Sequence, residues 1–132
     1  MAWPTHQAHA KVQEWFARHA REWWVTCPLT QTAFVRILSN PAFSPNALTP
    51  SDAIALLQAN LGHPGHRFWS DEIGIVQSLQ PFAQQLAGHQ QVTNAYLLGL
   101  AIYKKGKLAT LDRSIRTLLP DKSQESDFLI LI

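Results

Sequence analysis

One acidic side chain stands where an α/β sheet would present it to a ligand. Asp112 directly follows residues 108–111 (LATL), an apolar segment typical of a short strand. Ligands of open α/β sheets bind at the carboxyl ends of the strands, so Asp112 is a candidate for ligand or metal binding. The same carboxylate could instead cap a helix or pair with Arg113 or Arg116, and the residues alone leave that alternative open.

Two amide side chains begin predicted helices. Asn94 lies in the first turn of a nearly all-apolar helix predicted over residues 92–103, from which it would project toward the same edge as Asp112. Gln31 lies in the first turn of a helix that begins at Pro28. Polar side chains in a first turn are equally typical of helix capping.

The histidines and the single cysteine form no recognisable motif. His6 and His9 make one pair and His63 and His66 another, but nothing in the sequence groups the two pairs, and zinc sites need three or four ligands. Cys27 lacks a nucleophile signature, so we expect a buried structural thiol. The six glycines are scattered and form no phosphate-binding loop.

Hydrophobic periodicity and capping residues predict the elements that position these side chains. Thr93 is the expected N-cap of the apolar helix. Alternating helices and apolar strands are typical of an α/β domain with a mostly parallel sheet. Helices are expected over residues 5–21, 28–39, 53–61, 81–87 and 92–103, strands over residues 23–26, 66–69, 108–111 and 127–132, and a helix start or acidic loop at residues 70–72.

Composition excludes several functional classes. A chain of 132 residues with 46% hydrophobic and 15% charged residues suits one folded domain, residues 1–132, and argues against intrinsic disorder. A net charge of +2 leaves no basic stripe for nucleic acid. The longest apolar runs, residues 95–103 and 128–132, are too short to cross a membrane. One cysteine and no secretory signal predict a reducing, cytoplasmic location.

Three segments of the chain form a recognisable ordered set: residues 26–36 (TCPLTQTAFVR), 91–101 (QVTNAYLLGLA) and 107–113 (KLATLDR). Two shorter segments are residues 2–6 (AWPTH) and 66–71 (HRFWSD). In this order and spacing the three main segments resemble the PIN domain, specifically VapC-type toxins of toxin–antitoxin modules. The two shorter segments resemble the same group, so the likeness covers essentially the whole chain.

The resemblance implies a three-layer α/β/α domain with a parallel sheet. It also implies a ribonuclease that depends on Mg²⁺ or Mn²⁺ and carries a cluster of acidic residues at the carboxyl edge of the sheet. Hard divalent cations prefer such oxygen ligands and activate water for attack on a phosphate. The implied partners are an RNA substrate and a cognate antitoxin protein, and no association with a membrane is expected.

The sequence departs from the family pattern at three acidic positions. The family's first aspartate precedes a segment like residues 2–6, so we expect the opening strand and its aspartate to be absent and the domain to be N-terminally truncated. Gln31 matches the family's glutamate and Asn94 its third acid, so only Asp112 keeps a carboxylate. Asp112, Asn94 and Gln31 are the predicted catalytic residues and Asp112 and Asn94 the predicted metal ligands, with little activity expected from this chain as it stands.

Two other functions stay open. The Gln31 and Asn94 replacements favour a degenerate, non-catalytic PIN-like module that binds protein. A receiver-type regulatory domain is weaker, because it needs an acidic pocket near the chain start and Glu14 is the first acid here. We also expect a homodimer. A sheet that lacks its central strand would leave apolar surface uncovered, and exposed apolar surface favours association. The residues that supply this surface are Trp15, Trp23, Trp24 and residues 128–132.

Overall fold

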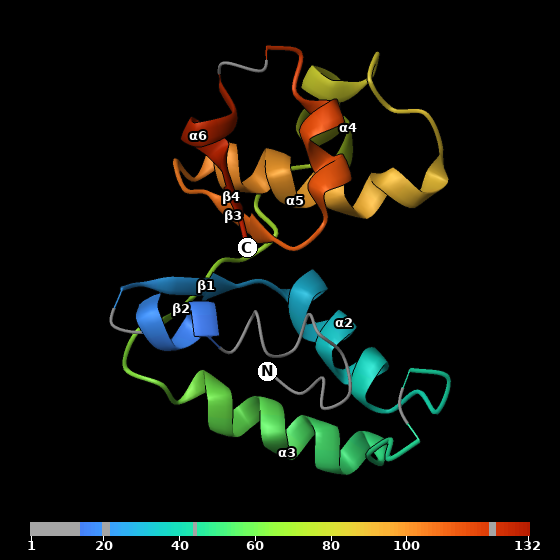
Figure 1. The fold of residues 1–132 in the computed structure, drawn as a ribbon, viewed down its shortest axis with the longest axis vertical. Coiled ribbons are helices and arrows are strands. Elements are labelled where there is room, and N and C mark those ends of the chain that lie inside the picture. Colours follow the sequence, from blue (N-terminus) through green and yellow to red (C-terminus); the bar gives the residue numbers. More distant parts are fainter. Residues whose placement is uncertain (1–13, 20–21, 44, 122–123) are drawn as a thin grey trace. The chain divides into compact units, whose positions relative to one another are not determined.

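The computed structural model describes residues 14–19, 22–43, 45–121 and 124–132. The chain divides into two compact units, Met1–Ser70 and Asp71–Ile132, and each is described by itself (Figure 1). The prediction of a single domain over residues 1–132 stays a prediction. None of the described helices combines the length and the apolar character needed to span a membrane.

The first unit combines a parallel strand pair with two packed helices. Trp24 pairs with His66 and Thr26 with Phe68 in the parallel register of its two strands. A further helical segment covers residues 14–19. The remaining elements are β1 (Trp24–Thr26), α2 (Pro28–Leu38), α3 (Pro50–Leu61) and β2 (His66–Phe68).

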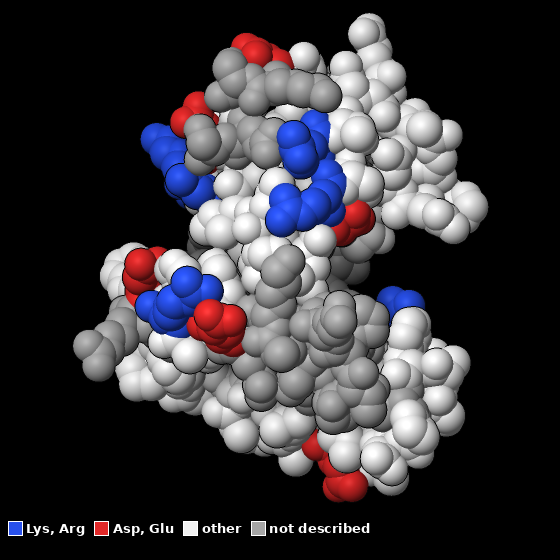
Figure 2. Space-filling view, in the orientation of Figure 1, with Lys and Arg blue, Asp and Glu red and all other residues white. Residues whose placement is uncertain are grey.

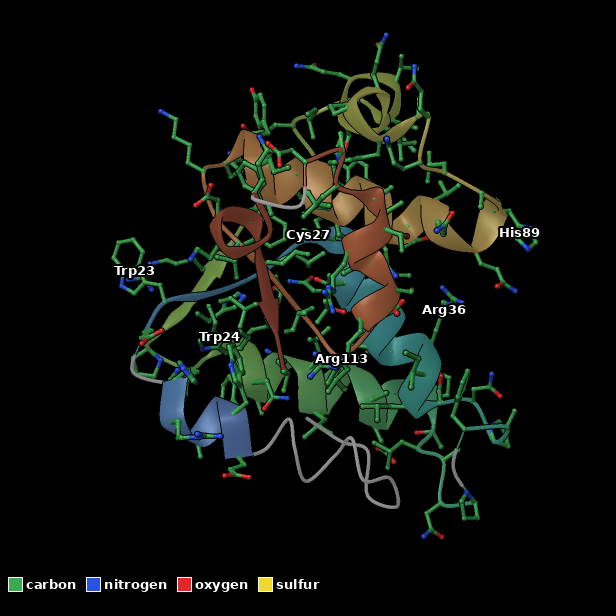
Figure 3. The ribbon with its side chains drawn as sticks, turned by 45° about the horizontal axis from the view of Figure 1, so that its top comes forward. Trp23, Trp24, Cys27, Arg36, His89 and Arg113 are labelled. Atoms are coloured by element: carbon green, nitrogen blue, oxygen red, sulfur yellow. The ribbon has the colours of Figure 1, made fainter. Side chains whose placement is uncertain are left out.

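Local chemistry explains where α2 and α3 begin. Proline is the first residue of each helix, where its fixed φ is favourable and its missing N–H costs no hydrogen bond. The Thr30 hydroxyl accepts a hydrogen bond from the Cys27 N–H at 2.9 Å, and the Thr49 hydroxyl accepts one from the Asp52 N–H at 3.1 Å. Cys27 is buried at the start of α2 (Figure 3), as predicted for a structural thiol.

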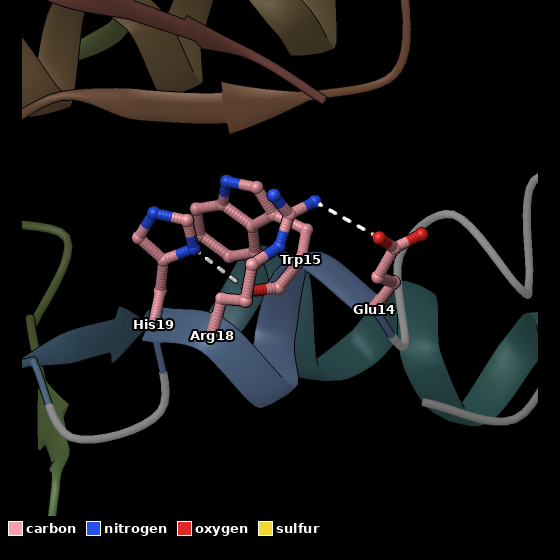
Figure 4. A network of polar contacts seen from close by, with 4 residues as sticks. All are labelled: Glu14, Trp15, Arg18 and His19. Carbon is pink, nitrogen blue, oxygen red and sulfur yellow. Dashed lines mark hydrogen bonds and ion pairs between the residues drawn. The ribbon is translucent and has the colours of Figure 1, made fainter.

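The helical segment 14–19 is held by contacts between successive turns (Figure 4). The Trp15 and His19 rings stack with their centroids 4.7 Å apart, and His19 Nδ1 lies 2.8 Å from the Trp15 carbonyl oxygen. Arg18 and Glu14 form an exposed ion pair at 3.4 Å. The rest of the predicted helix 5–21, together with His6, His9 and segment 2–6, lies outside the described residues.

The second unit contains a parallel strand pair and a buried central helix. Its core comprises apolar side chains of which Leu98, Ile115 and Leu118 are almost fully buried. The elements are α4 (Ile75–Leu79), α5 (Val92–Tyr103), β3 (Leu108–Thr110), α6 (Glu125–Phe128), β4 (Leu129–Leu131) and three 3₁₀ helices, Gln80–Phe82, His89–Gln91 and Arg113–Leu118.

The α/β class and the parallel pairing predicted from the sequence are both confirmed. Leu108 pairs with Leu129 and Thr110 with Leu131 in a parallel register. The described strands form two sheets of two strands each, one in each unit. The two strands of the second unit consist mainly of apolar residues, LAT and LIL, which is typical of parallel strands.

Three local predictions in the second unit are wrong. Thr93 is not the N-cap of α5: the helix is capped at Gln91, whose side chain accepts hydrogen bonds from the Ala87 and Gly88 N–H groups. The helix predicted over residues 81–87 is reduced to the 3₁₀ turn Gln80–Phe82. Residues 70–72 form a loop, one of the two outcomes predicted for them, and a helix begins after them at Ile75. The final strand, predicted over residues 127–132, is limited to Leu129–Leu131, because residues 127 and 128 belong to α6.

The end of α5 has a lysine where glycine is usual. The Lys105 N–H donates to the Ile102 carbonyl and the Gly106 N–H to the Ala101 carbonyl, at 3.0 and 2.8 Å. This pattern is a Schellman motif, whose C′ residue must be left-handed, and Lys105 has φ 60°. The sequence places glycine one position later, at C″.

Lys105→Gly should therefore stabilise the protein. Glycine removes the steric cost of a left-handed side-chain-bearing residue, so we expect the free energy of unfolding to rise by about 1 kcal/mol. Urea denaturation measures the change. Lys107→Gly is the matched control, because Lys107 lacks a positive φ and the same substitution there should give no gain. Equal effects at both positions would contradict the left-handed conformation of Lys105.

Candidate functional site

The carboxylate of Asp112 is fixed by hydrogen bonds on one side. Asp112 lies two residues after β3 and caps the 3₁₀ helix Arg113–Leu118. Its Oδ1 accepts hydrogen bonds from the Ser114 N–H at 2.9 Å and the Ser114 hydroxyl at 2.6 Å. Its own N–H donates to the Thr110 hydroxyl at 3.0 Å. Because Oδ1 is engaged by Ser114, Oδ2 is the oxygen directed to the rest of the site.

Asn94 occupies the other side of the carboxylate. It lies in the first turn of α5, and its Nδ2 donates to Asp112 Oδ2 at 3.3 Å. The sequence predicted that a helix start and a strand end would bring these two residues together, and they are in contact. Their assignment as metal ligands stays a prediction.

A small pocket lies beside this pair. Its volume is about 140 Å³, enough for several water molecules or a hydrated cation. Polar groups line one part and apolar side chains the other; the lining residues are Gln90, Gln91, Asn94, Asp112, Ser114, Ile115 and Leu118. The pocket therefore combines carboxylate, amide and hydroxyl oxygens with an apolar wall from the core.

The donor set is suited in kind to a hard divalent cation. Mg²⁺ usually keeps several water ligands and binds through one or two carboxylates, which matches one carboxylate with adjacent amide oxygens. Within the part of the chain that the structure describes, no three His, Cys, Asp or Glu side chains lie together as metal ligands. The site supplies a single negative charge, so a cation would be held more weakly than by several carboxylates.

Gln31 lies in the first unit and makes its contacts there. It is in the first turn of α2, and its Nε2 donates to the Thr26 hydroxyl at 3.0 Å. The Thr26 hydroxyl also lies 2.7 Å from His66 Nε2. Gln31 is thus part of a polar chain that links α2, β1 and β2.

The predicted site did not include Ser114, nor the pair Thr26 and His66. Ser114 could have been found, because a serine two residues after an aspartate is the usual spacing of a side-chain-to-backbone turn. Thr26 and His66 are 40 residues apart, and no local signal connects them. Their contact depends on the parallel pairing of β1 with β2.

Charge is mixed on the surface around these elements. On the face drawn in Figure 2, described lysine and arginine side chains lie next to acidic ones. Lys104 and Glu72 form an ion pair at 2.8 Å. Trp23 is 76% exposed, projects to the outside in Figure 3, and carries the Arg67 guanidinium 4.5 Å from its ring centroid.

The parallel strand pairs, with an aspartate after a strand beside an amide at a helix start, place the chain in the α/β class and agree with the resemblance to the PIN domain. Comparison with curated proteins agrees. VapC38, a ribonuclease of Mycobacterium tuberculosis, is 37% identical over 132 residues, which span 100% of this chain and 92% of VapC38. Ribonuclease VapC39 of the same organism is 34% identical over 87% of this chain and 83% of its own length.

A third relative extends the same finding. Ribonuclease VapC44 of Mycobacterium tuberculosis is 34% identical over 83% of this chain and 77% of its own length. No family model matches the chain. These identities cover most of both partners in each comparison, and the chain belongs to the VapC family of PIN-domain ribonucleases.

Proposed function

We propose that this chain hydrolyses RNA phosphodiesters at the pocket beside Asp112 and Asn94, with Mg²⁺ or Mn²⁺ as its cofactor. The observation that carries the proposal is the contact of Asn94 Nδ2 with Asp112 Oδ2 at 3.3 Å, next to a polar pocket, in a chain 37% identical to the ribonuclease VapC38. Gln31, in the first unit, stays a predicted catalytic residue because it matches the family's glutamate.

Each side chain has a distinct part in this proposal. Asp112 supplies the negative charge that attracts the cation, and Ser114 fixes Oδ1 so that Oδ2 is presented to the pocket. Asn94 supplies an amide that can turn its oxygen toward a cation. A bound Mg²⁺ or Mn²⁺ would activate water and offset the charge of the attacked phosphate.

The test is cleavage of labelled structured and unstructured RNAs with Mg²⁺, Mn²⁺ or EDTA. The wild-type chain should cleave slowly and only with metal, because one carboxylate holds the cation weakly. Asn94→Asp should increase metal affinity roughly 10- to 100-fold, because a charged ligand contributes about 1.5–3 kcal/mol to cation binding. Cleavage at low metal concentration should increase in parallel.

The control for this gain is an equal change of charge elsewhere. Asn60→Asp, at the end of α3, adds the same charge in the first unit and should leave cleavage unchanged. If Asn94→Asp and Asn60→Asp behave alike, the pocket is not the cation site.

The proposed partners follow from the family. They are an RNA substrate, a cognate antitoxin protein and a second copy of the chain, in the cytoplasm. Exposed apolar side chains support protein association: Val76 is 77% exposed and Ile75 57% exposed, both on α4. Sedimentation of the purified chain would show the dimer, and a compact monomer at high concentration would exclude it.

A second candidate is a PIN-like module that binds protein without catalysis. It is favoured by the single carboxylate at the site, where Gln31 and Asn94 stand in place of acids. In this case neither the wild-type chain nor Asn94→Asp would cleave RNA with either metal, yet the chain would still bind a small partner protein tightly.

A further inference from the structure

Three side chains from three elements form a continuous hydrogen-bonded chain in the first unit. Gln31 Nε2, in α2, donates to the Thr26 hydroxyl at the end of β1, at 3.0 Å. The Thr26 hydroxyl in turn lies 2.7 Å from Nε2 of His66, the first residue of β2. Thr26 and His66 lie on the same face of the strand pair, because their register positions differ by two residues.

The Gln31 amide gives the hydrogen-bonded series a direction. An amide nitrogen only donates, so the Thr26 oxygen accepts from Gln31, and its hydroxyl hydrogen can be donated to His66 Nε2. Donation to Nε2 requires the neutral ring of His66 to carry its proton on Nδ1. The series therefore runs from Gln31 through Thr26 to His66.

The surroundings of His66 favour this neutral form. Burial of the ring lowers the pKa of His66, as does the nearby charge of Arg67, while the bond to the Leu61 carbonyl acts in the opposite direction. The Trp24 ring packs against it with centroids 4.7 Å apart. Among the described residues, His63 lies against the same indole: it contacts Trp24, and its Nδ1 accepts from the Gly65 N–H at 3.0 Å.

We propose that His66 and Thr26 are positioning residues that hold the Gln31 amide with its nitrogen toward β1, and that this relay is set for an amide, and not a carboxylate, at position 31. The role of Gln31 in RNA cleavage rests on the proposed function; the polarity of the relay does not. Because Nε2 is held by Thr26, the oxygen Oε1 is the end of the amide directed away from the strand.

A carboxylate at position 31 would reverse the relay. Its oxygens carry no hydrogen, so they would accept from the Thr26 hydroxyl, which could then no longer donate to His66 Nε2. The contact between Thr26 and His66 would survive only if Nε2 carried a proton and donated instead. Gln31→Glu should therefore favour doubly protonated His66, and Thr26→Val should break the coupling.

Nuclear magnetic resonance of the histidine ring nitrogens tests the relay directly. In the wild-type chain, His66 should be the Nδ1–H tautomer when neutral. Gln31→Glu should raise its pKa by about one unit, the lower end of the effect of a nearby opposite charge. Gln58→Glu, on the exposed face of α3, is the matched control and should leave the pKa of His66 almost unchanged. An Nε2–H tautomer in the wild type, or equal shifts in both variants, would overturn the relay.

A double-mutant cycle tests the positioning role. His66→Gln and Gln31→Ala should each lower kcat for RNA cleavage, and the double variant should be no slower than Gln31→Ala alone, because both changes remove the same function. Additive losses would show that His66 does not act through Gln31 and would overturn the positioning role. If no variant, including Asn94→Asp, cleaves RNA, the proposed ribonuclease function fails, while the resonance data still decide the relay.

Discussion

Asp112→Asn is expected to reduce metal-dependent RNA cleavage by about 10- to 100-fold, the cost of replacing a charged ligand by a neutral one. Asn keeps the shape of the side chain and can still accept the Ser114 N–H bond that begins the 3₁₀ helix. The substitution therefore removes the charge with little change of structure. Cleavage of labelled RNA with Mn²⁺ measures the loss, in the wild-type chain and in the more active Asn94→Asp background.

The matched control is Asp127→Asn, an exposed aspartate of α6. It should leave the rate within about twofold, because an exposed charge outside the pocket contributes little. If Asp112→Asn cleaves as fast as the Asp127→Asn control in both backgrounds, the site assignment is wrong.

Gly99→Ala should have the largest effect on stability. Gly99 is buried in α5, where a methyl group would overlap the Ser78 hydroxyl and lie 2.5 Å from the Ser78 carbonyl oxygen. Ser78 is itself almost fully buried, and its hydroxyl donates to the Tyr96 carbonyl at 3.0 Å. Since backbone atoms of α4 are involved, the clash cannot be relieved by a rotamer change.

The substitution must therefore separate α4 from α5 or break the Ser78 bond. We expect a loss of about 3 kcal/mol in the free energy of unfolding, from overpacking together with a buried hydroxyl left without its acceptor. Gly88→Ala is the control, because a methyl group there meets nothing within 4 Å. A midpoint of urea denaturation equal to that of Gly88→Ala would contradict the close packing of the two helices.

The elements that were predicted best are those with a signal within a few residues. The range of α5 is matched because its apolar run ends at two lysines and a glycine. Its cap was missed because Gln91 bonds back to the loop that precedes it, which outweighs the intrinsic preference for threonine at an N-cap. Likewise, α4 was missed because its five residues are too few to show a period.

The site was predictable in part for the same reason. The contact between Asn94 and Asp112 follows from a helix start and a strand end, both visible in the sequence. The contact of Ser114 with Oδ1 also has a local signal, the spacing of a serine two residues after an aspartate, which the prediction did not use. The contact between Thr26 and His66 depends on strand register and is not determined by residue type alone.

Mn²⁺ binding, measured by calorimetry on the wild-type chain and on Asp112→Asn, tests the central claim most directly. The claim is that the pocket beside Asp112 and Asn94 holds the catalytic cation. It predicts one weak site in the wild type, tighter binding in Asn94→Asp, and loss of that site in Asp112→Asn. Identical Mn²⁺ isotherms for the wild type and Asp112→Asn would contradict it.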